Sequence, residues 1–258
     1  MISTIFDKQV AVVTGAGQGI GFEIARQLSL NGASVILNDA DTELAEKAAE
    51  AINAAGGNPC YAMPGDASDV AFIRSMVEEG VTRFGQVTLA VANAGLSLYG
   101  NFFDYPESDF DRVMKVNLGG SFYLAQAVSN QIIKQKSGGS IVLVSSVTGH
   151  QALKDLAAYA ITKAGLEMLA KNLVVEVSPH QISVNAVAPG ATLTERTLTY
   201  EDYINAWSEI TPMGRPETVA DIANAVLFLL SPASRHITGQ SIVIDGGWTS
   251  ISPAPPNK

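Results

Sequence analysis

A tyrosine and a lysine stand four residues apart in the segment AYAITKAG, at Tyr159 and Lys163. In a helix, side chains at this spacing project from the same face, one turn apart. A positive charge beside a tyrosine favours its ionised form, so such a pair can take up and release a proton near neutral pH. Surface helices also contain Tyr–Lys pairs without chemistry, so the surrounding residues decide the interpretation.

Two serines precede this pair at the end of the apolar segment SIVLVSS. Its length and composition predict a buried strand, and the carboxyl ends of such strands are where α/β sheets bind ligands. A hydroxyl placed there can hydrogen-bond a substrate oxygen and stabilise charge that develops on it. Neighbouring side chains of a strand point to opposite faces, so only one of Ser145 and Ser146 can serve.

A glycine-rich segment, TGAGQGIG, runs from Thr14 to Gly21 after the first apolar strand candidate. Its glycines permit a tight turn and bring backbone N–H groups close to a pyrophosphate, which the N-terminus of the following helix also attracts. Glycine-rich turns alone are weak evidence, but here a strand precedes the turn and a helix follows it. The segment therefore predicts a dinucleotide site.

An acid, Asp39, ends the second strand candidate. A carboxylate at this position can accept hydrogen bonds from both ribose hydroxyls of a dinucleotide, and it would repel a 2′-phosphate. No Arg or Lys stands at Gln18, Asn38 or Ala40 to receive such a phosphate. We therefore expect NAD rather than NADP as the cofactor.

Short apolar segments alternate with amphipathic helical segments along the whole chain. The strand candidates are residues 10–14, 34–38, 60–63, 87–92, 140–145, 182–188 and 241–245, and the main helix candidates are 41–57, 69–85, 108–136 and 218–232. Near-continuous apolar strands indicate burial on both faces. The pattern predicts an α/β fold with a Rossmann-type, doubly wound parallel sheet of about seven strands flanked by helices. We expect one domain over residues 1–258.

Two segments depart from this alternation. Residues 191–216 are polar, aromatic and poorly periodic, as expected of a substrate lid beyond the end of a strand. Residues 251–258 form a Pro-rich tail that we expect to be mobile.

The overall composition excludes several classes of partner. A net charge of −9 argues against nucleic acid and anionic membranes, which attract basic surfaces. The sequence has a single cysteine, Cys60, so it cannot form an intramolecular disulfide, which suits a reducing compartment. We expect Cys60 to be a small residue of the core. No metal-ligand spacing, secretion signal or membrane-spanning apolar segment occurs in the sequence, so we expect no metal site and a cytoplasmic protein.

Eight motifs in order resemble those of the short-chain dehydrogenase/reductase family, from about residue 7 to residue 248. They are TGAGQGIG, GDASD, ANAG, VNLGG, VSSVTG, YAITK, APGATLT and GQSIVIDGGW. The segment ANAG differs from the family's Asn-Asn-Ala-Gly at Ala92, a mainly structural position, and keeps Asn93.

The resemblance implies roles for individual residues and favours Ser146 over Ser145. Asn117 would kink the long helix and anchor a water that links Lys163 to solvent, while Lys163 would also hold the nicotinamide ribose. The implied catalytic residues are Asn117, Ser146, Tyr159 and Lys163. The implied cofactor-binding residues are Gly15, Gln18, Gly19, Ile20, Gly21, Asp39, Asp66, Ala67, Asn93, Ala94, Gly95, Tyr159, Lys163, Pro189, Gly190, Thr192 and Thr194.

The substrate pocket is expected between the loop after Ala94, the segment after Ser146 and the lid. Its predicted lining is Leu96, Ser146, His150, Leu153, Tyr159, Tyr200, Tyr203 and Trp207. This mixture of aromatic and hydroxyl groups suits a polyol, a sugar or a hydroxyketone, while acids in the lid disfavour phosphorylated or polyacidic substrates. His150 also fits a polar loop residue.

Three functions remain open at this point. The first is an NAD-dependent dehydrogenase of a secondary alcohol, and the second is a 3-oxoacyl-thioester (acyl-carrier-protein) reductase, an activity that usually favours NADPH. The third is a nucleotide-binding protein without catalysis.

The resemblance also implies a homotetramer, or a homodimer, joined through the long helices and the C-terminal strand region. The apolar face of residues 164–177 could serve that interface or the core.

Overall fold

Seven parallel strands form the centre of the computed structural model, which describes residues 5–252. Their order across the sheet is β3-β2-β1-β4-β5-β6-β9. The bounds are β1 Val10–Val13, β2 Ser34–Leu37, β3 Cys60–Ala62, β4 Leu89–Ala92, β5 Gly139–Val144, β6 Ile182–Pro189 and β9 Ser241–Ile244. The chain moves outward from β1 to β3 and then returns to build the other half from β4. The carboxyl ends of β1 and β4 therefore flank a switch point, where such sheets bind ligands.

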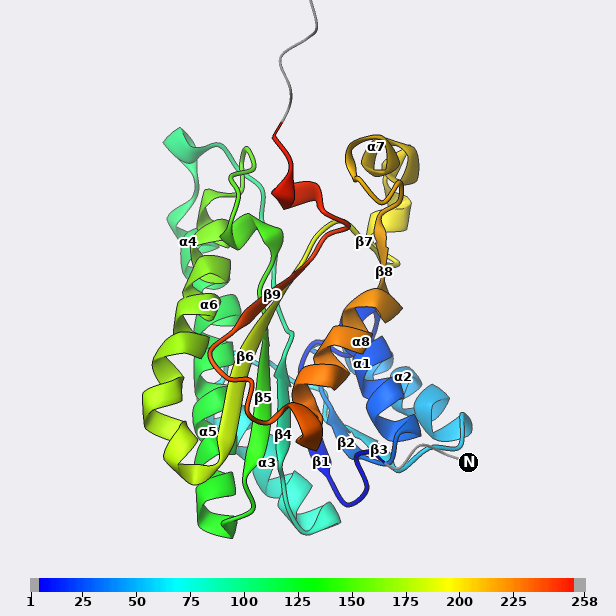
Figure 1. The fold of residues 1–258 in the computed structure, drawn as a ribbon, viewed down its shortest axis with the longest axis vertical. Coiled ribbons are helices and arrows are strands. Elements are labelled where there is room, and N and C mark those ends of the chain that lie inside the picture. The colour runs from blue at the N-terminus through cyan, green and yellow to red at the C-terminus, as the bar shows by residue number, and fades with distance from the viewer. Residues whose placement is uncertain (1–4, 253–258) are drawn as a thin grey trace, which may run out of the picture.

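Helices cover both faces of the sheet (Figure 1). One layer contains α1 (Gly19–Leu30), α2 (Thr42–Ala54) and α8 (Val219–Leu230), and the other contains α3 (Val70–Phe84), α5 (Ser121–Gln135) and α6 (Ala157–Val177). The predicted doubly wound α/β domain is confirmed.

Alternation along β1 shows why the strand sequences are apolar throughout. Val10 and Val12 belong to the core layer beneath α3 and α5, while Ala11 and Val13 belong to the layer beneath α1 and α8. Successive side chains of a strand point to opposite faces, so a sheet covered twice needs apolar residues at every position. The same pattern buries Cys60 on β3, and burial raises the pKa of its thiol to about 12.

The continuous helix predicted over residues 108–136 is interrupted. Helix α4 (Glu107–Val113) passes into a π-helical segment, Met114–Gly120, before α5 begins. A β-carbon added to Gly120 would lie 2.5 Å from the carbonyl oxygen of Ala67, so the helix passes directly over the loop that follows β3. π-Helical turns of this kind often occur at functional sites.

The predicted lid contains regular structure that its sequence pattern does not indicate. The strand β7 (Thr192–Leu193) pairs in parallel with β8 (Glu217–Thr218), and helix α7 (Tyr203–Ile210) lies between them in the chain, above the carboxyl ends of the strands (Figure 1). A row of aromatic rings continues from the lid to the segment after β9, because the ring centres of Trp207 and Trp248 are 5.5 Å apart.

Of the predicted tail, residues 251–252 are exposed and irregular, and residues 253–258 lie outside the described part of the chain. No helix among residues 5–252 has the length and apolar character needed to cross a membrane. The same residues contain no cluster of His, Cys, Asp and Glu side chains suited to a metal ion.

Candidate active site

The glycine turn between β1 and α1 is closely packed. Gly15 and Gly19 have φ angles of +60° and +61°, which L side chains rarely adopt. A β-carbon on Gly21 would lie 2.3 Å from the carbonyl oxygen of Gly15. The side chain of Asn93, just after β4, donates hydrogen bonds to the carbonyl oxygens of Thr14 and Gly15 at 3.0 and 2.7 Å. The residue that follows β4 therefore stabilises the glycine turn through these two hydrogen bonds.

A cavity of about 630 Å³ opens beside this turn. Its lining includes the predicted cofactor residues Gly15, Gln18, Asp39, Asp66, Ala67, Asn93, Ala94 and Gly95. Asp39 is held in place by two backbone groups: its Oδ2 accepts from the N–H of Gly17 at 2.9 Å and its Oδ1 from the N–H of Asp41 at 3.1 Å. The bare glycine backbone and the fixed carboxylate fit a dinucleotide whose ribose lies at the end of β2.

Two cations, Arg112 and Lys115, also line this cavity, and the sequence motifs do not single them out. They face Asp66, whose carboxylate accepts from the N–H and the hydroxyl of Ser68 at 2.8 and 2.7 Å. The hydrogen bonds from Ser68 hold the pKa of Asp66 below its usual value, and the positive charges of Lys115 and Arg112 lower it further. Asp66 thus stays ionised and balances part of the positive charge of the two cations.

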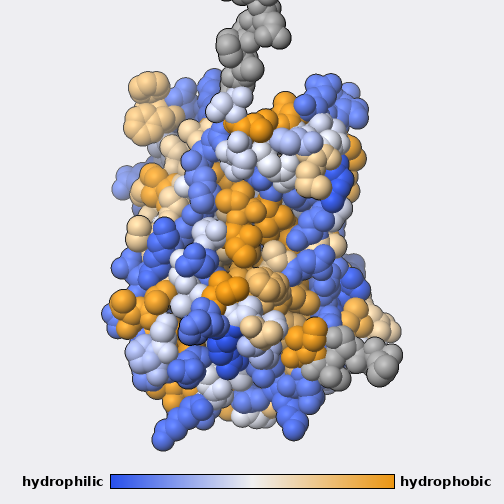
Figure 2. Space-filling view, viewed as in Figure 1, coloured by the Kyte–Doolittle hydropathy of each residue, from blue (hydrophilic) through white to orange (hydrophobic). Residues whose placement is uncertain are grey.

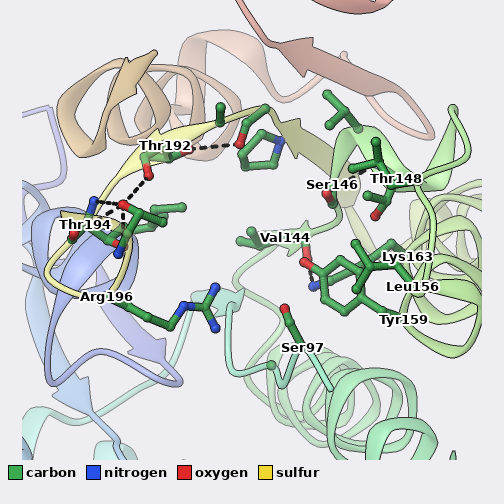
Figure 3. A pocket seen from close by; sticks show the side chains of 18 of the residues that line it. Ser97, Val144, Ser146, Thr148, Leu156, Tyr159, Lys163, Thr192, Thr194 and Arg196 are labelled. Atoms are coloured by element: carbon green, nitrogen blue, oxygen red, sulfur yellow. Dashed lines mark hydrogen bonds between the residues drawn. The ribbon is translucent and has the colours of Figure 1, made fainter. Parts of the chain in front are cut away.

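A second cavity of about 380 Å³ continues from the first and contains the candidate chemistry (Figure 3). Ser146, Tyr159 and Lys163 lie together on one wall of it. Ser145 is buried, with its Oγ 2.8 Å from both the carbonyl oxygen of Lys163 and Oε1 of Glu167. Its hydroxyl therefore has partners within the protein, whereas Ser146 is placed toward the cavity.

Helix α6 sets the relation between Tyr159 and Lys163. The ammonium nitrogen of Lys163 lies 5.3 Å from the centre of the Tyr159 ring. Lys163 is buried and donates a hydrogen bond to the carbonyl oxygen of Val144, at the end of β5, at 2.7 Å. The charge is thereby held beneath the tyrosine, at the edge of the sheet where Ser146 begins its turn.

Asn117 lies in the π-helical segment and is fully buried. Its Oδ1 accepts from the N–H of Leu96 at 2.7 Å, and its Nδ2 donates to the carbonyl oxygen of Leu96 at 3.0 Å and to Thr162 Oγ1 at 3.2 Å. The main-chain oxygen of Asn117 accepts from the hydroxyl of Ser121 at 2.7 Å. Asn117 thus joins the loop after β4 to α6, while the expected water between it and Lys163 stays a prediction.

The base of the lid forms the opposite wall of the second cavity, with Pro189, Gly190, Thr192 and Thr194. Thr197 fixes its shape, because its hydroxyl donates to the carbonyl oxygen of Thr192 at 2.8 Å and accepts from the N–H of Thr194 at 2.8 Å. A β-carbon on Gly19 would lie 3.4 Å from Thr194 Cγ2. The base of the lid therefore lies against the glycine turn, and Ile20 of α1 lines the same cavity.

Two acids that sequence reasoning missed are buried behind this wall, Glu217 on β8 and Asp245 after β9. Burial raises the pKa of Glu217 to about 7, and the negative charges of Asp245 and Asp221 act in the same direction. Burial by itself would raise the pKa of Asp245 as well, but hydrogen bonds from Thr249 and Gly247 outweigh it and lower the pKa.

The predicted substrate residues divide into three groups. Leu153, Tyr200, Tyr203 and Trp207 line the second cavity, and Leu96 lines the cofactor cavity instead. His150 lines neither, because its Nε2 lies 2.9 Å from Oε1 of Glu167. Ser97, Tyr99 and Arg196 also line the second cavity, and Arg196 extends its guanidinium into it (Figure 3). They come from loops whose direction no periodic pattern indicates.

A dinucleotide-type turn at the switch point and a Ser–Tyr–Lys wall beside it define an oxidoreductase of the nicotinamide-dependent α/β class. The chain belongs to the short-chain dehydrogenase/reductase family. A family model described as enoyl-(acyl carrier protein) reductase matches residues 15–249.

Among relatives, the 3-oxoacyl-[acyl-carrier-protein] reductase of Staphylococcus aureus is 37% identical over 240 residues, covering 92% of this chain and 96% of the relative. The L-rhamnose 1-dehydrogenase (NAD(P)(+)) of a Sphingomonas species is 32% identical over 246 residues, covering 94% of this chain and 97% of the relative. A crystal structure of gluconate 5-dehydrogenase from Burkholderia cenocepacia with NADP and tartrate superposes with a TM-score of 0.89, at 30% identity, covering 97% of this chain and 99% of that chain.

Proposed function

We propose that this chain is an NAD(H)-dependent oxidoreductase that interconverts a secondary alcohol and a ketone. The observation that supports this most strongly is the shared wall of Ser146, Tyr159 and Lys163, which faces the Pro189–Gly190 segment beside the cofactor cavity. Three chemically suited side chains thus meet next to the place where a nicotinamide ring would extend from the glycine turn.

When bound, the nicotinamide supplies or accepts the hydride at the carbinol carbon. The chain's own residues manage the oxygen. In the oxidation, Tyr159 takes the hydroxyl proton while the C–H electron pair leaves as hydride, and in the reduction Tyr159 returns that proton. The Ser146 hydroxyl donates a hydrogen bond to the same oxygen and stabilises its developing negative charge. Lys163 holds its ammonium group 5.3 Å from the centre of the phenol ring and so fixes a cation beside the group that exchanges the proton.

Asp39 supports NAD over NADP. Its carboxylate is fixed by the N–H groups of Gly17 and Asp41, and a 2′-phosphate on the adenosine ribose would meet its negative charge. Arg112 and Lys115 line the same cavity, and the carboxylate of Asp66 balances part of their charge. The names of related proteins include both NAD(P)(+) and NADP. The preference for NAD over NADP therefore rests on Asp39.

We propose a polyol, sugar or hydroxyketone as the substrate. The second cavity carries hydroxyl groups of Ser97, Tyr99 and Tyr200 around an aromatic base, which suits a ligand with several hydroxyls. Relatives named for rhamnose and gluconate oxidation support the same class. The alternative is 3-oxoacyl-thioester reduction, the activity named for the Staphylococcus aureus relative. The intact Ser146, Tyr159 and Lys163 argue against a protein without catalysis.

We further propose a cytoplasmic homotetramer, or a homodimer. On α5 and α6 the large apolar residues Phe122, Tyr123, Met168 and Val175 are exposed. Apolar side chains also gather over the edge strand β9 and α8, where Val243 and Phe228 are exposed (Figure 2). Exposed large apolar residues on these elements are what we would expect of faces that a second copy covers.

A substrate panel tests the proposal. Polyols, sugars, cyclic alcohols and 3-hydroxyacyl thioesters are each offered with NAD⁺ and with NADP⁺, and NAD(P)H formation is followed by absorbance. We expect NAD⁺-linked oxidation of a polyhydroxy compound. Turnover of acetoacetyl thioester with NADPH alone would favour the reductase alternative, and no turnover of any pair would contradict the proposal.

A further inference from the structure

Glu167 lies on α6 one helical turn after Lys163 and two turns after Tyr159. Its side chain is largely buried, at 12% exposure, yet it does not line either cavity. We infer that Glu167 is a positioning residue: its carboxylate clamps the turn that carries Ser146 against the helix that carries Tyr159 and Lys163. The inference rests on the proposed function.

One carboxylate oxygen makes both contacts. Oε1 of Glu167 lies 2.8 Å from the hydroxyl of Ser145 and 2.9 Å from Nε2 of His150. Ser145 immediately precedes Ser146, and His150 follows it by four residues. The Ser145 hydroxyl has a single proton, which it shares between this oxygen and the equally near carbonyl oxygen of Lys163, also on α6. Glu167 is therefore the one acceptor that both ends of the turn contact, and a carboxylate accepts stronger hydrogen bonds than a neutral group.

The turn itself is short and closely packed. Its own bonds are local: the Ser146 hydroxyl accepts from the N–H of Thr148 at 3.2 Å, and the carbonyl oxygen of Ser146 accepts from the N–H of Gly149 at 2.9 Å. A β-carbon on Gly149 would lie 3.0 Å from Oε1 of Glu167 and 3.1 Å from the main-chain nitrogen of Ala164. Glycine therefore lets the turn reach the helix, and Glu167 holds it there.

This clamp matters because the two catalytic hydroxyls come from different elements. Ser146 belongs to the turn after β5 and Tyr159 to α6, but both must point at one substrate oxygen. A misplacement of about 1 Å at such a site can cost about 100-fold in rate. The ammonium group of Lys163, on the same helix, is turned to the carbonyl oxygen of Val144 instead.

Four variants test the inference: Glu167→Ala, Glu167→Gln, His150→Ala and, as the matched control, Glu176→Ala, which removes an exposed acid from the same helix. With the fastest substrate of the panel, we expect Glu167→Ala to lower kcat by about 10- to 100-fold and to change the KM for NAD⁺ by less than about twofold. Glu167→Gln keeps an acceptor oxygen and should therefore keep most of the wild-type kcat. His150→Ala should lower kcat by less than Glu167→Ala does. Glu176→Ala should have the wild-type kcat.

Hydrogen–deuterium exchange provides a readout that needs no substrate. Loss of the clamp should speed amide exchange at Gly149 and His150 in Glu167→Ala, with the Glu176→Ala control unchanged. Wild-type exchange and kcat in Glu167→Ala would overturn the inference. So would losses of kcat, NADH binding and thermal stability in proportion, because they would indicate a general structural role. If Glu167→Ala does not fold, kcat and amide exchange are measured on His150→Ala, and these two readouts then test the inference. Absence of turnover in the wild type would instead contradict the proposed function, and exchange would still decide the clamp.

Discussion

The ammonium group of Lys163 joins two elements at once: it lies 5.3 Å from the centre of the Tyr159 ring and donates to the carbonyl oxygen of Val144 at 2.7 Å. Lys163 is buried, so its ammonium group, and not bulk water, is the donor to that carbonyl in the folded protein. The same contact therefore anchors α6 to the end of β5 and places a positive charge near the tyrosine.

Replacing Lys163 by methionine should affect both roles. An unpaired buried carbonyl costs about 1–3 kcal/mol, so we expect the free energy of unfolding of Lys163→Met to fall by about that amount. Turnover should fall by at least about 100-fold, because the cation beside the proton-exchanging tyrosine is gone. Urea denaturation and steady-state kinetics measure the two effects. Full stability with lost turnover would show that the Val144 contact is dispensable.

Ser145 and Ser146 should respond differently to alanine substitution. Both serines line the second cavity, but Ser145 is buried and its proton is used by acceptors on α6, whereas the Ser146 hydroxyl only accepts a hydrogen bond and keeps its proton for a ligand. We expect Ser146→Ala to lower kcat by about 100-fold or more, since a donor to the developing oxyanion is lost. Its thermal stability should fall only by the small cost of losing the hydrogen bond from the N–H of Thr148. Ser145→Ala should lower kcat by about tenfold or less. An inactive Ser145→Ala beside an active Ser146→Ala would reverse the assignment.

Asp39 should control the choice between the two cofactors. Asp39→Ala removes the acceptor for the ribose hydroxyls and the charge that repels a 2′-phosphate. We expect NAD⁺ to bind at least about tenfold more weakly and NADP⁺ more tightly, both by calorimetry. Asp41→Ala is the control, because Asp41 caps α2 and is not part of the cofactor cavity. Wild-type protein that binds NADP⁺ as tightly as NAD⁺ would contradict the preference.

Glu217 should make the stability of the protein fall as pH rises. Its pKa is raised to about 7 in the folded protein, so between pH 4.5 and 7 the folded state binds more protons than the unfolded state. Stability is therefore lost over that interval, by at most about 3 kcal/mol. Denaturation from about pH 5 to about pH 8 should show this decline in the wild type and a smaller one in Glu217→Gln. Equal declines in both proteins would indicate that Glu217 is ionised in the fold at every pH tested.

The sequence was sufficient to predict the sheet because its signals are local. Continuous apolar segments predict every strand of the sheet to within a few residues, and the glycine turn predicts the switch point that the strand order shows. The predicted catalytic residues Ser146, Tyr159 and Lys163 meet at one cavity wall, because each belongs to a motif with a fixed place on β5 or α6.

The features that the sequence did not predict depend on contacts between distant segments. The β7–β8 pair links residues 25 positions apart through two residues each, which is too short for a periodic signal. His150 was expected in the substrate pocket, and it turns to Glu167 because a buried carboxylate oxygen on α6 lies within reach. Likewise, Arg196 and Tyr99 line the cavity through the course of their loops.

The most direct test of the whole account is turnover by Tyr159→Phe beside the wild type, with NADH binding measured on the same samples. Removing only the phenolic oxygen should lower kcat by about 1,000-fold or more, since no other group in the cavity takes the proton, and leave the Kd for NADH within about threefold. Retained turnover in Tyr159→Phe would contradict the central claim that Tyr159 is the acid and base of this enzyme.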